Sequence, residues 1–128
     1  MAVPRRYAQT HEWIRLEDDG TATIGISAYA VEALTDLVFM QLPDLGRHVK
    51  AGEPLGEIES VKAVSDLYAP VSGEVVAVNS ELPQRLETLG EDPYEAGWIV
   101  RIRPDRADDV QSLLDQTAYD ALVAKQSH

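Results

Sequence analysis

One lysine in this sequence has the surroundings of an attachment point for a chemical group. Lys62 lies in the middle of "ESVKAVSDL" (59–67), with acidic side chains on both sides at Glu59 and Asp66. Short extended runs precede and follow this segment, so the chain is expected to reverse here without the Gly, Asn or Pro that tight turns commonly use. A free amine is readily acylated, and a hairpin tip would hold it clear of the molecule. The segment therefore favours a covalent tether at Lys62.

The alternative is an ordinary surface lysine. Its methylene groups would then lie over Val61 and Val64 while the ammonium group stays in water. Two features favour a special role: the chain has eight arginines but only three lysines, and an exposed turn has no reason to carry a run of apolar residues. From these residues alone, both interpretations stay open.

The composition excludes several kinds of chemistry. The chain has no cysteine, so it cannot supply a disulfide, a thiolate metal site or a cysteine nucleophile. His11, His48 and His128 show no metal-ligand spacing, and no nucleophile and base stand at a recognisable spacing for an enzyme. Eleven basic against 22 acidic residues give a formal charge of −11, which disfavours nucleic acids and anionic membranes as partners.

The first two thirds of the chain predict a β-rich core. Apolar and polar residues alternate in short runs separated by turn signals, and "DDG" (18–20) joins the first two runs into a hairpin. The runs expected to form strands are 12–17, 21–27, 37–42, 51–60, 71–79 and 97–104. Two similar stretches, "VKAGEPLGEIE" (49–59) and "APVSGEVVAVN" (69–79), flank Lys62, which places it at the tip of a hairpin. In 37–42, alternation predicts that Val38, Met40 and Leu42 share one side.

Two helices are predicted outside these strands. Ser27 is a plausible N-cap for a short helix over 28–37. A second, amphipathic helix is expected over about 106–125, lying on the sheet. Its apolar positions are Val110, Leu113, Leu114, Ala118 and Leu122. With 128 residues, we expect a single domain with a β core over about 7–104.

Several motifs together resemble one known family. The segment "ESVKAVSDLYAPVSGEV" (59–75) is similar to the lipoyl-attachment segment of the glycine cleavage system H protein family. Further matches follow in order and spacing: "THEW" (10–13), "ATIGIS.YA" (22–30), "LVFMQLP" (37–43), "G..V.AGEPLG.IESVKA" (46–63), "EDPY..GW" (91–98) and "LLD...YDAL" (113–122). Biotinyl domains usually have a Met beside the lysine, and the domains of 2-oxoacid dehydrogenase complexes usually have "DKA". This chain has Val61 and Ala63 instead.

The resemblance implies a mainly β fold, a barrel-sandwich hybrid of two antiparallel sheets with a C-terminal helix, like that of lipoyl and biotinyl domains. It also implies that Lys62 carries lipoic acid in amide linkage. The cofactor would then bring the disulfide that a chain without cysteine lacks. Members of the family are carriers and not enzymes, because a tethered group meets each active site without being released.

The implied partners load, unload and reoxidise the tethered group. By resemblance, the chain receives an aminomethyl group from pyridoxal-phosphate-dependent glycine decarboxylase (P protein). The aminomethyltransferase (T protein) moves the one-carbon unit to tetrahydrofolate, and the flavin-dependent dihydrolipoyl dehydrogenase (L protein) reoxidises the dithiol with NAD. A lipoyl or octanoyl ligase or transferase and lipoyl synthase would install lipoic acid on Lys62.

Three polar residues match positions where the family is thought to dock the loaded arm. Thr10 and Glu12 stand in the "[ST]HEW" motif, and Asp66 stands in the "VKAxSD" motif. The carboxylates of Glu12 and Asp66 would bind and shield the cationic amine of the cargo. The alternative is that Glu12 is an outward residue of an alternating strand and Asp66 a solvated hairpin acid.

Two further residues match the family near the lysine. Glu59 could be recognised by the lipoylating enzymes or be a simple strand-end acid. Gly73, eleven positions after Lys62, resembles a glycine common to lipoyl domains. We expect Gly73 to serve a turn that needs a positive φ angle, with recognition by the lipoylating enzymes following from the shape of that turn.

Two alternatives to a glycine cleavage carrier stay open. The chain could distribute lipoyl groups to other proteins, or it could be a binding module that uses the hairpin as a contact surface. Its first 13 residues hold no apolar run of signal-peptide length, and no later segment is long enough to span a bilayer. We therefore expect a cytoplasmic monomer, or a protein of the mitochondrial matrix if a transit peptide has been removed.

Overall fold

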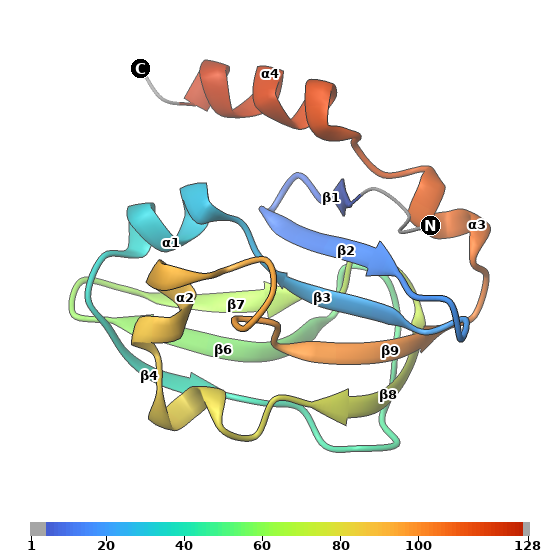
Figure 1. The fold of residues 1–128 in the computed structure, drawn as a ribbon, viewed down its shortest axis with the longest axis horizontal. Helices are drawn as coiled ribbons and strands as arrows, with labels where there is room; N and C mark the ends of the chain where they lie inside the picture. The colour runs from blue at the N-terminus through green and yellow to red at the C-terminus, as the bar shows by residue number, and fades with distance from the viewer. Residues whose placement is uncertain (1–4, 127–128) are drawn as a thin grey trace.

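Two antiparallel sheets form the computed structural model, which describes residues 5–126 (Figure 1). The larger sheet has six strands in the order β1-β2-β3-β9-β8-β5, and the smaller has three in the order β4-β6-β7. The larger sheet consists of β1 (Arg6–Tyr7), β2 (Glu12–Leu16), β3 (Ala22–Ile26), β5 (His48–Val49), β8 (Gly73–Val78) and β9 (Val100–Pro104). The smaller consists of β4 (Leu37–Gln41), β6 (Pro54–Ser60) and β7 (Val64–Tyr68). The predicted mainly β fold of two antiparallel sheets is confirmed.

A single large cluster of buried aliphatic side chains lies in the core and includes residues of both sheets. Ile24 and Ile102 come from the six-stranded sheet, and Met40 and Ile58 come from the three-stranded sheet. Met40 on β4 lies opposite Ile58 on β6, so both side chains point to the same face of the sheet, where both are buried.

The predicted first hairpin is confirmed by the pairing of β2 with β3. Ile14 lies opposite Ile24, and Gly20 takes a φ angle of 88° in the turn between the strands. Lys62 also lies in a hairpin turn, between β6 and β7. The prediction that the second arm of this hairpin lies within 69–79 is wrong. That stretch forms β8, which pairs with β5 and β9 in the other sheet.

The helix after the first hairpin begins where the sequence predicts. α1 (Ala28–Leu34) has Ser27 as its N-cap, and the Ser27 hydroxyl accepts a hydrogen bond from the backbone N–H of Ala30. It ends three residues before the predicted Leu37, because Thr35 takes a left-handed φ angle of 62°. The short 3-10 helix η1 (Leu82–Gln84) and the helix α2 (Glu87–Glu91) are not predicted from the sequence.

The expectation of one continuous C-terminal helix over about 106–125 is wrong. Two helices, α3 (Asp108–Gln111) and α4 (Gln116–Gln126), replace it. Between them, Leu114 forms an isolated β-bridge with Tyr7, exchanging backbone hydrogen bonds of 2.8 and 3.0 Å. Figure 1 shows the result: α4 lies above β1 and β2, and α3 lies beside the far end of β2. No helix in residues 5–126 is long and apolar enough to cross a bilayer.

The shared side predicted for Val38, Met40 and Leu42 is also wrong. The register between β4 and β6 shifts between Leu37 and Phe39, which is the mark of a β-bulge. Val38 is consequently 56 % exposed while Met40 is buried. The bulge turns two consecutive residues, Val38 and Phe39, towards solvent.

Candidate functional site

The β6–β7 hairpin presents Lys62 at its tip. The two strands pair from Pro54 opposite Tyr68 to Glu59 opposite Val64, and three residues, 61–63, connect them. All three connecting residues are exposed, and Val61, directly before Lys62, is 71 % exposed. Within residues 5–126, no hydrogen bond or ion pair holds the Lys62 side chain. Its amine is therefore available to another molecule.

A serine explains why this turn needs no glycine, asparagine or proline. The buried Ser60 hydroxyl accepts hydrogen bonds from the backbone N–H groups of Lys62 (3.3 Å) and Ala63 (3.1 Å). The backbone N–H of Ser60 donates to the carbonyl of Ala63 at 2.8 Å, which closes the hairpin. Serine hydroxyls stabilise turns in this way without a left-handed residue. Outside the hairpin, the backbone carbonyl of Asp36 accepts a hydrogen bond from Val61 N–H at 2.9 Å.

Glu12 joins the two sheets. Its side chain is only 2 % exposed, and its carboxylate accepts hydrogen bonds from the Thr10 hydroxyl and from the backbone N–H of Tyr68 (3.0 Å). Burial raises the pKa of the Glu12 carboxyl above its ordinary value of 4.5, while these hydrogen bonds act in the opposite direction. The alternative interpretation, in which Glu12 is an outward strand residue, is wrong. It is a buried link between β2 and the end of β7.

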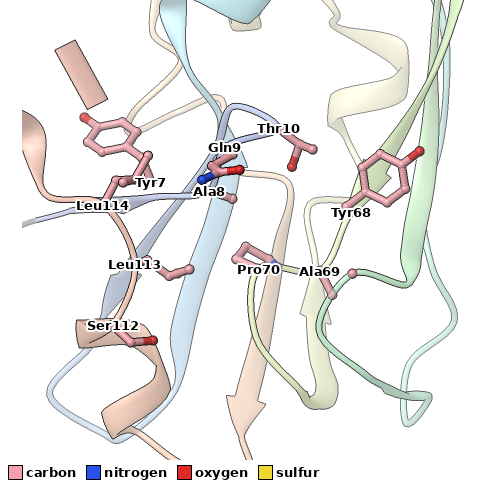
Figure 2. Close-up of a pocket in the computed structure, with 11 residues that line it drawn as sticks. Tyr7, Ala8, Gln9, Thr10, Tyr68, Ala69, Pro70, Ser112, Leu113 and Leu114 are labelled. Atoms are coloured by element: carbon pink, nitrogen blue, oxygen red, sulfur yellow. The ribbon is translucent and has the colours of Figure 1, made fainter. Parts of the chain in front are cut away.

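A cavity of about 480 Å³ lies beside this link (Figure 2). Thr10 and Tyr68, the two partners of Glu12, both line it. Its other walls come from the chain around Tyr7, the segment 69–70 and the segment 112–114 between α3 and α4. The lining is mostly apolar with a few hydroxyl groups, which is the usual character of a small-molecule site.

Comparison with known proteins identifies the family to which this chain belongs. The family model described as "Glycine cleavage H-protein" matches residues 5–126. This chain belongs to the glycine cleavage H-protein family. The glycine cleavage system H protein of Alkalilimnicola ehrlichii is 56 % identical over 93 % of this chain and 92 % of its own length. That of Chromohalobacter salexigens is 54 % identical over 93 % and 91 %.

A solved structure agrees with this assignment. The crystal structure of a glycine cleavage system H protein from Mycobacterium marinum has a TM-score of 0.86 and 43 % sequence identity to this chain. The match covers 95 % of this chain and 99 % of the other. The H-protein family and the two-sheet fold are therefore established together.

Only two of the three residues predicted to dock the arm of an H protein lie in contact. Thr10 and Glu12 are joined by a hydrogen bond beside the 480 Å³ cavity. Asp66 is exposed and lines a different cavity of about 270 Å³, together with Arg47 and Glu57. Asp66 is nevertheless two residues before Tyr68, so both side chains share the outward face of β7. This face runs from the tip towards the larger cavity.

The positive φ angle expected at Gly73 is wrong. Positive φ angles occur at Gly20, Gly46 and Gly52, whereas Gly73 lies within β8 without one. A Cβ atom at this position would lie 2.5 Å from the carbonyl oxygen of Arg103. The glycine is needed because β8 and β9 approach closely. Glu59 pairs with Val64 directly before the turn.

A polar contact that holds α4 against the rest of the molecule is not predicted from the sequence. The Tyr119 hydroxyl lies 2.6 Å from Ser27 Oγ and 2.8 Å from His11 Nδ1. Burial raises the pKa of Tyr119 to about 12. These partners lie 92 and 108 residues apart in the chain, so no local pattern could reveal them. Among residues 5–126, no three His, Cys, Asp or Glu side chains gather to hold a metal ion, and His128 lies outside this range.

Proposed function

We propose that this chain carries lipoic acid on Lys62 and acts as the aminomethyl carrier of the glycine cleavage system. The observation that carries the proposal is the exposed, unpaired Lys62 at the tip of the β6–β7 hairpin in a member of the H-protein family. An acylating enzyme needs an accessible amine on a backbone of fixed shape. The hydrogen bonds of Ser60 fix that shape.

The chain fits lipoic acid in a second respect. Lipoic acid supplies a reversible disulfide, and this chain has no cysteine with which to make one. The protein contributes a tether and no bond-making groups, so we assign it no catalytic residue. Tethering raises the effective concentration of the group at each partner active site.

Its proposed partners are those of a carrier. Glycine decarboxylase (P protein) would load it, aminomethyltransferase (T protein) would unload it, and dihydrolipoyl dehydrogenase (L protein) would reoxidise it. A lipoyl or octanoyl ligase or transferase and lipoyl synthase would install the cofactor. We place these encounters in the cytoplasm, or in the mitochondrial matrix for a eukaryotic source.

The test of the attachment site is an intact-mass measurement on protein from lipoate-fed cells, followed by peptide mapping. We expect one lipoyl increment on the peptide that contains Lys62. Lys62→Arg should abolish the increment, whereas the control Lys50→Arg, at another exposed lysine, should retain it. An unmodified Lys62 beside a ligase that acylates a control domain would refute the proposal.

We further propose that the loaded arm lies along the outward face of β7. Asp66 and Tyr68 follow one another along this face, and Tyr68 and Thr10 line the 480 Å³ cavity with Glu12 behind them. Burial raises the pKa of the Glu12 carboxyl, and the two hydrogen bonds that it accepts act against this rise. Above this pKa the Glu12 carboxylate would attract the cationic amine of the cargo.

The lifetime of the loaded aminomethyl group tests this docking. Asp66→Asn and Glu12→Gln should each shorten the lifetime, because each removes a negative charge next to the proposed path. Asp18→Asn, at an exposed acid in the turn between β2 and β3, is the matched control. Equal lifetimes in all four proteins, wild type included, would refute the docking and leave the attachment at Lys62 intact.

A further inference from the structure

Exposed apolar side chains gather at the end of the smaller sheet that presents Lys62. The large apolar side chains that are strongly exposed in residues 5–126 are Val38, Phe39, Leu45, Val61 and Val64, at 47–71 %. All except Leu45 belong to the hairpin tip or to the start of β4 beside it. We call Val38, Phe39, Val61 and Val64 the tip patch. Leu45 follows the opposite end of β4.

Strand pairing brings the members of the tip patch together. Phe39 on β4 lies opposite Glu59 on β6, and Glu59 lies opposite Val64 on β7. Side chains directly opposite one another on a sheet face are about 5 Å apart at Cβ, so these three form one continuous row. Val61 follows at the tip, where its N–H donates to Asp36 directly before β4. The patch therefore spans all three strands.

The bulge in β4 enlarges this patch by exposing a second apolar side chain to water. A regular strand would turn one of Val38 and Phe39 inward, whereas the shift in register leaves both exposed, at 56 and 47 %. Bulges commonly redirect side chains next to functional sites. Contiguous apolar patches on a soluble protein are typical of contact surfaces. The bulge therefore indicates a surface that another protein covers.

The charges around the tip patch indicate what kind of surface covers it. Glu59 stands within the first row, and the next row across the sheet consists of Gln41, Glu57 and Asp66. Within the described chain, the Lys62 amine has no acidic partner, and acylation would remove its charge. A complementary partner would place an apolar recess over Phe39 and arginine or lysine side chains against the acids.

We propose that the tip patch is the docking surface for the enzyme that acylates Lys62. This rests on the proposed attachment of lipoic acid. A lysine amine extends only four methylene groups from the backbone, so an enzyme that acts on it must close over the tip itself. Enzymes that act on the far end of the attached arm can stand further away. Recognition thus includes β4 as well as the hairpin.

The test is the rate of Lys62 acylation by a purified lipoate ligase supplied with lipoic acid and ATP, followed by intact mass. Phe39→Ser should lower kcat/KM about 10-fold or more, mostly through KM, since a buried aromatic anchor dominates such contacts. Phe39→Leu should restore most of the rate. Leu45→Ser, which removes an apolar side chain that is more exposed than Phe39 and lies elsewhere, should leave the rate within about twofold of wild type.

A second variant guards against damage to the fold. Val61→Ser changes a side chain that is 71 % exposed and should also slow acylation, with no change in the thermal midpoint. Rates for Phe39→Ser and Val61→Ser equal to that of Leu45→Ser would overturn the docking surface while Lys62 remained the attachment site. A wild-type Lys62 left unmodified by a ligase that acylates a control domain would overturn both proposals.

Discussion

The outer faces of the two sheets differ in their exposure to solvent. All five residues of β3, in the six-stranded sheet, are buried. In β7, of the three-stranded sheet, only Leu67 is buried, and Val64 and Asp66 are exposed. The six-stranded sheet is covered on both faces at β3, although Arg103 on its strand β9 is exposed. The three-stranded sheet presents its outward face to solvent.

The cause is the cover over the six-stranded sheet. Trp13 stands over Gly25, where a Cβ atom would lie 2.6 Å from the indole nitrogen, and α4 adds Tyr119 stacked on Tyr7 with ring centroids 4.2 Å apart. These aromatic side chains form a second buried cluster. Stability and presentation are therefore separated by face: the buried faces of both sheets maintain the fold, and the outward face of the open sheet can display Lys62 and accept changes.

A matched pair of truncations would test this separation most strongly. Ile24→Ala, at a fully buried position of β3, should lower the free energy of unfolding by about 2–5 kcal/mol, because it leaves a cavity in the core. Val64→Ala, at a position that is 59 % exposed, should change it by no more than about 0.5 kcal/mol. Denaturant unfolding measures both values. Similar losses for the two variants would show that the outward face of the open sheet contributes as much to stability as the buried core.

A smaller effect would define how the open sheet holds its turn. Ser60→Ala removes the acceptor for two backbone N–H groups at the tip and should cost about 1–2 kcal/mol. Hydrogen exchange should accelerate at the amides of Lys62 and Ala63 before it does elsewhere. Ser65→Ala is the control, since its half-buried hydroxyl has no such role at the tip. Unchanged exchange at those two amides would mean that the turn keeps its shape without Ser60.

The parts of the fold that the sequence predicts well are those set by neighbouring residues. The alternation in 12–26 predicts the first hairpin, and Ser27 predicts the start of α1. The attachment segment is recognisable because its whole motif lies within 59–75. A hydroxyl directly before a turn is also a local signal, so the role of Ser60 could have been inferred from its position.

The parts that were mispredicted depend on residues far apart in the chain. The C-terminal helix is interrupted because Leu114 pairs with Tyr7, and helical spacing across 113–122 cannot reveal that bridge. The bulge at Val38 depends on its pairing with β6. Glu12 looks like a polar residue at the start of an alternating strand, yet its hydrogen-bond partner Tyr68 is 56 positions away. Long-range pairing decides these features, and a single sequence does not display it.

The junction between the two sheets offers the finest test of the comparison, through its pH dependence. Glu12 on β2 accepts a hydrogen bond from Tyr68 at the end of β7, and burial raises the pKa of its carboxyl above the ordinary value of 4.5. A carboxyl with a raised pKa binds its proton more tightly in the folded state than in the unfolded state. Its contribution to stability is therefore fully present below pH 4.5 and is lost as the pH rises through the folded pKa.

Glu12→Gln removes this titration and keeps the shape of the side chain. The unfolding free energy of wild type minus that of Glu12→Gln should therefore decrease as the pH rises from 4.5 through the folded pKa of Glu12, and then level off. Denaturant unfolding at several pH values measures this difference directly. A difference that is constant or that increases with pH would mean that burial does not dominate the environment of Glu12. The hydrogen bonds from Thr10 and Tyr68 would then hold the carboxylate ionised, and the two sheets would be joined by a charged link that strengthens as Glu12 ionises.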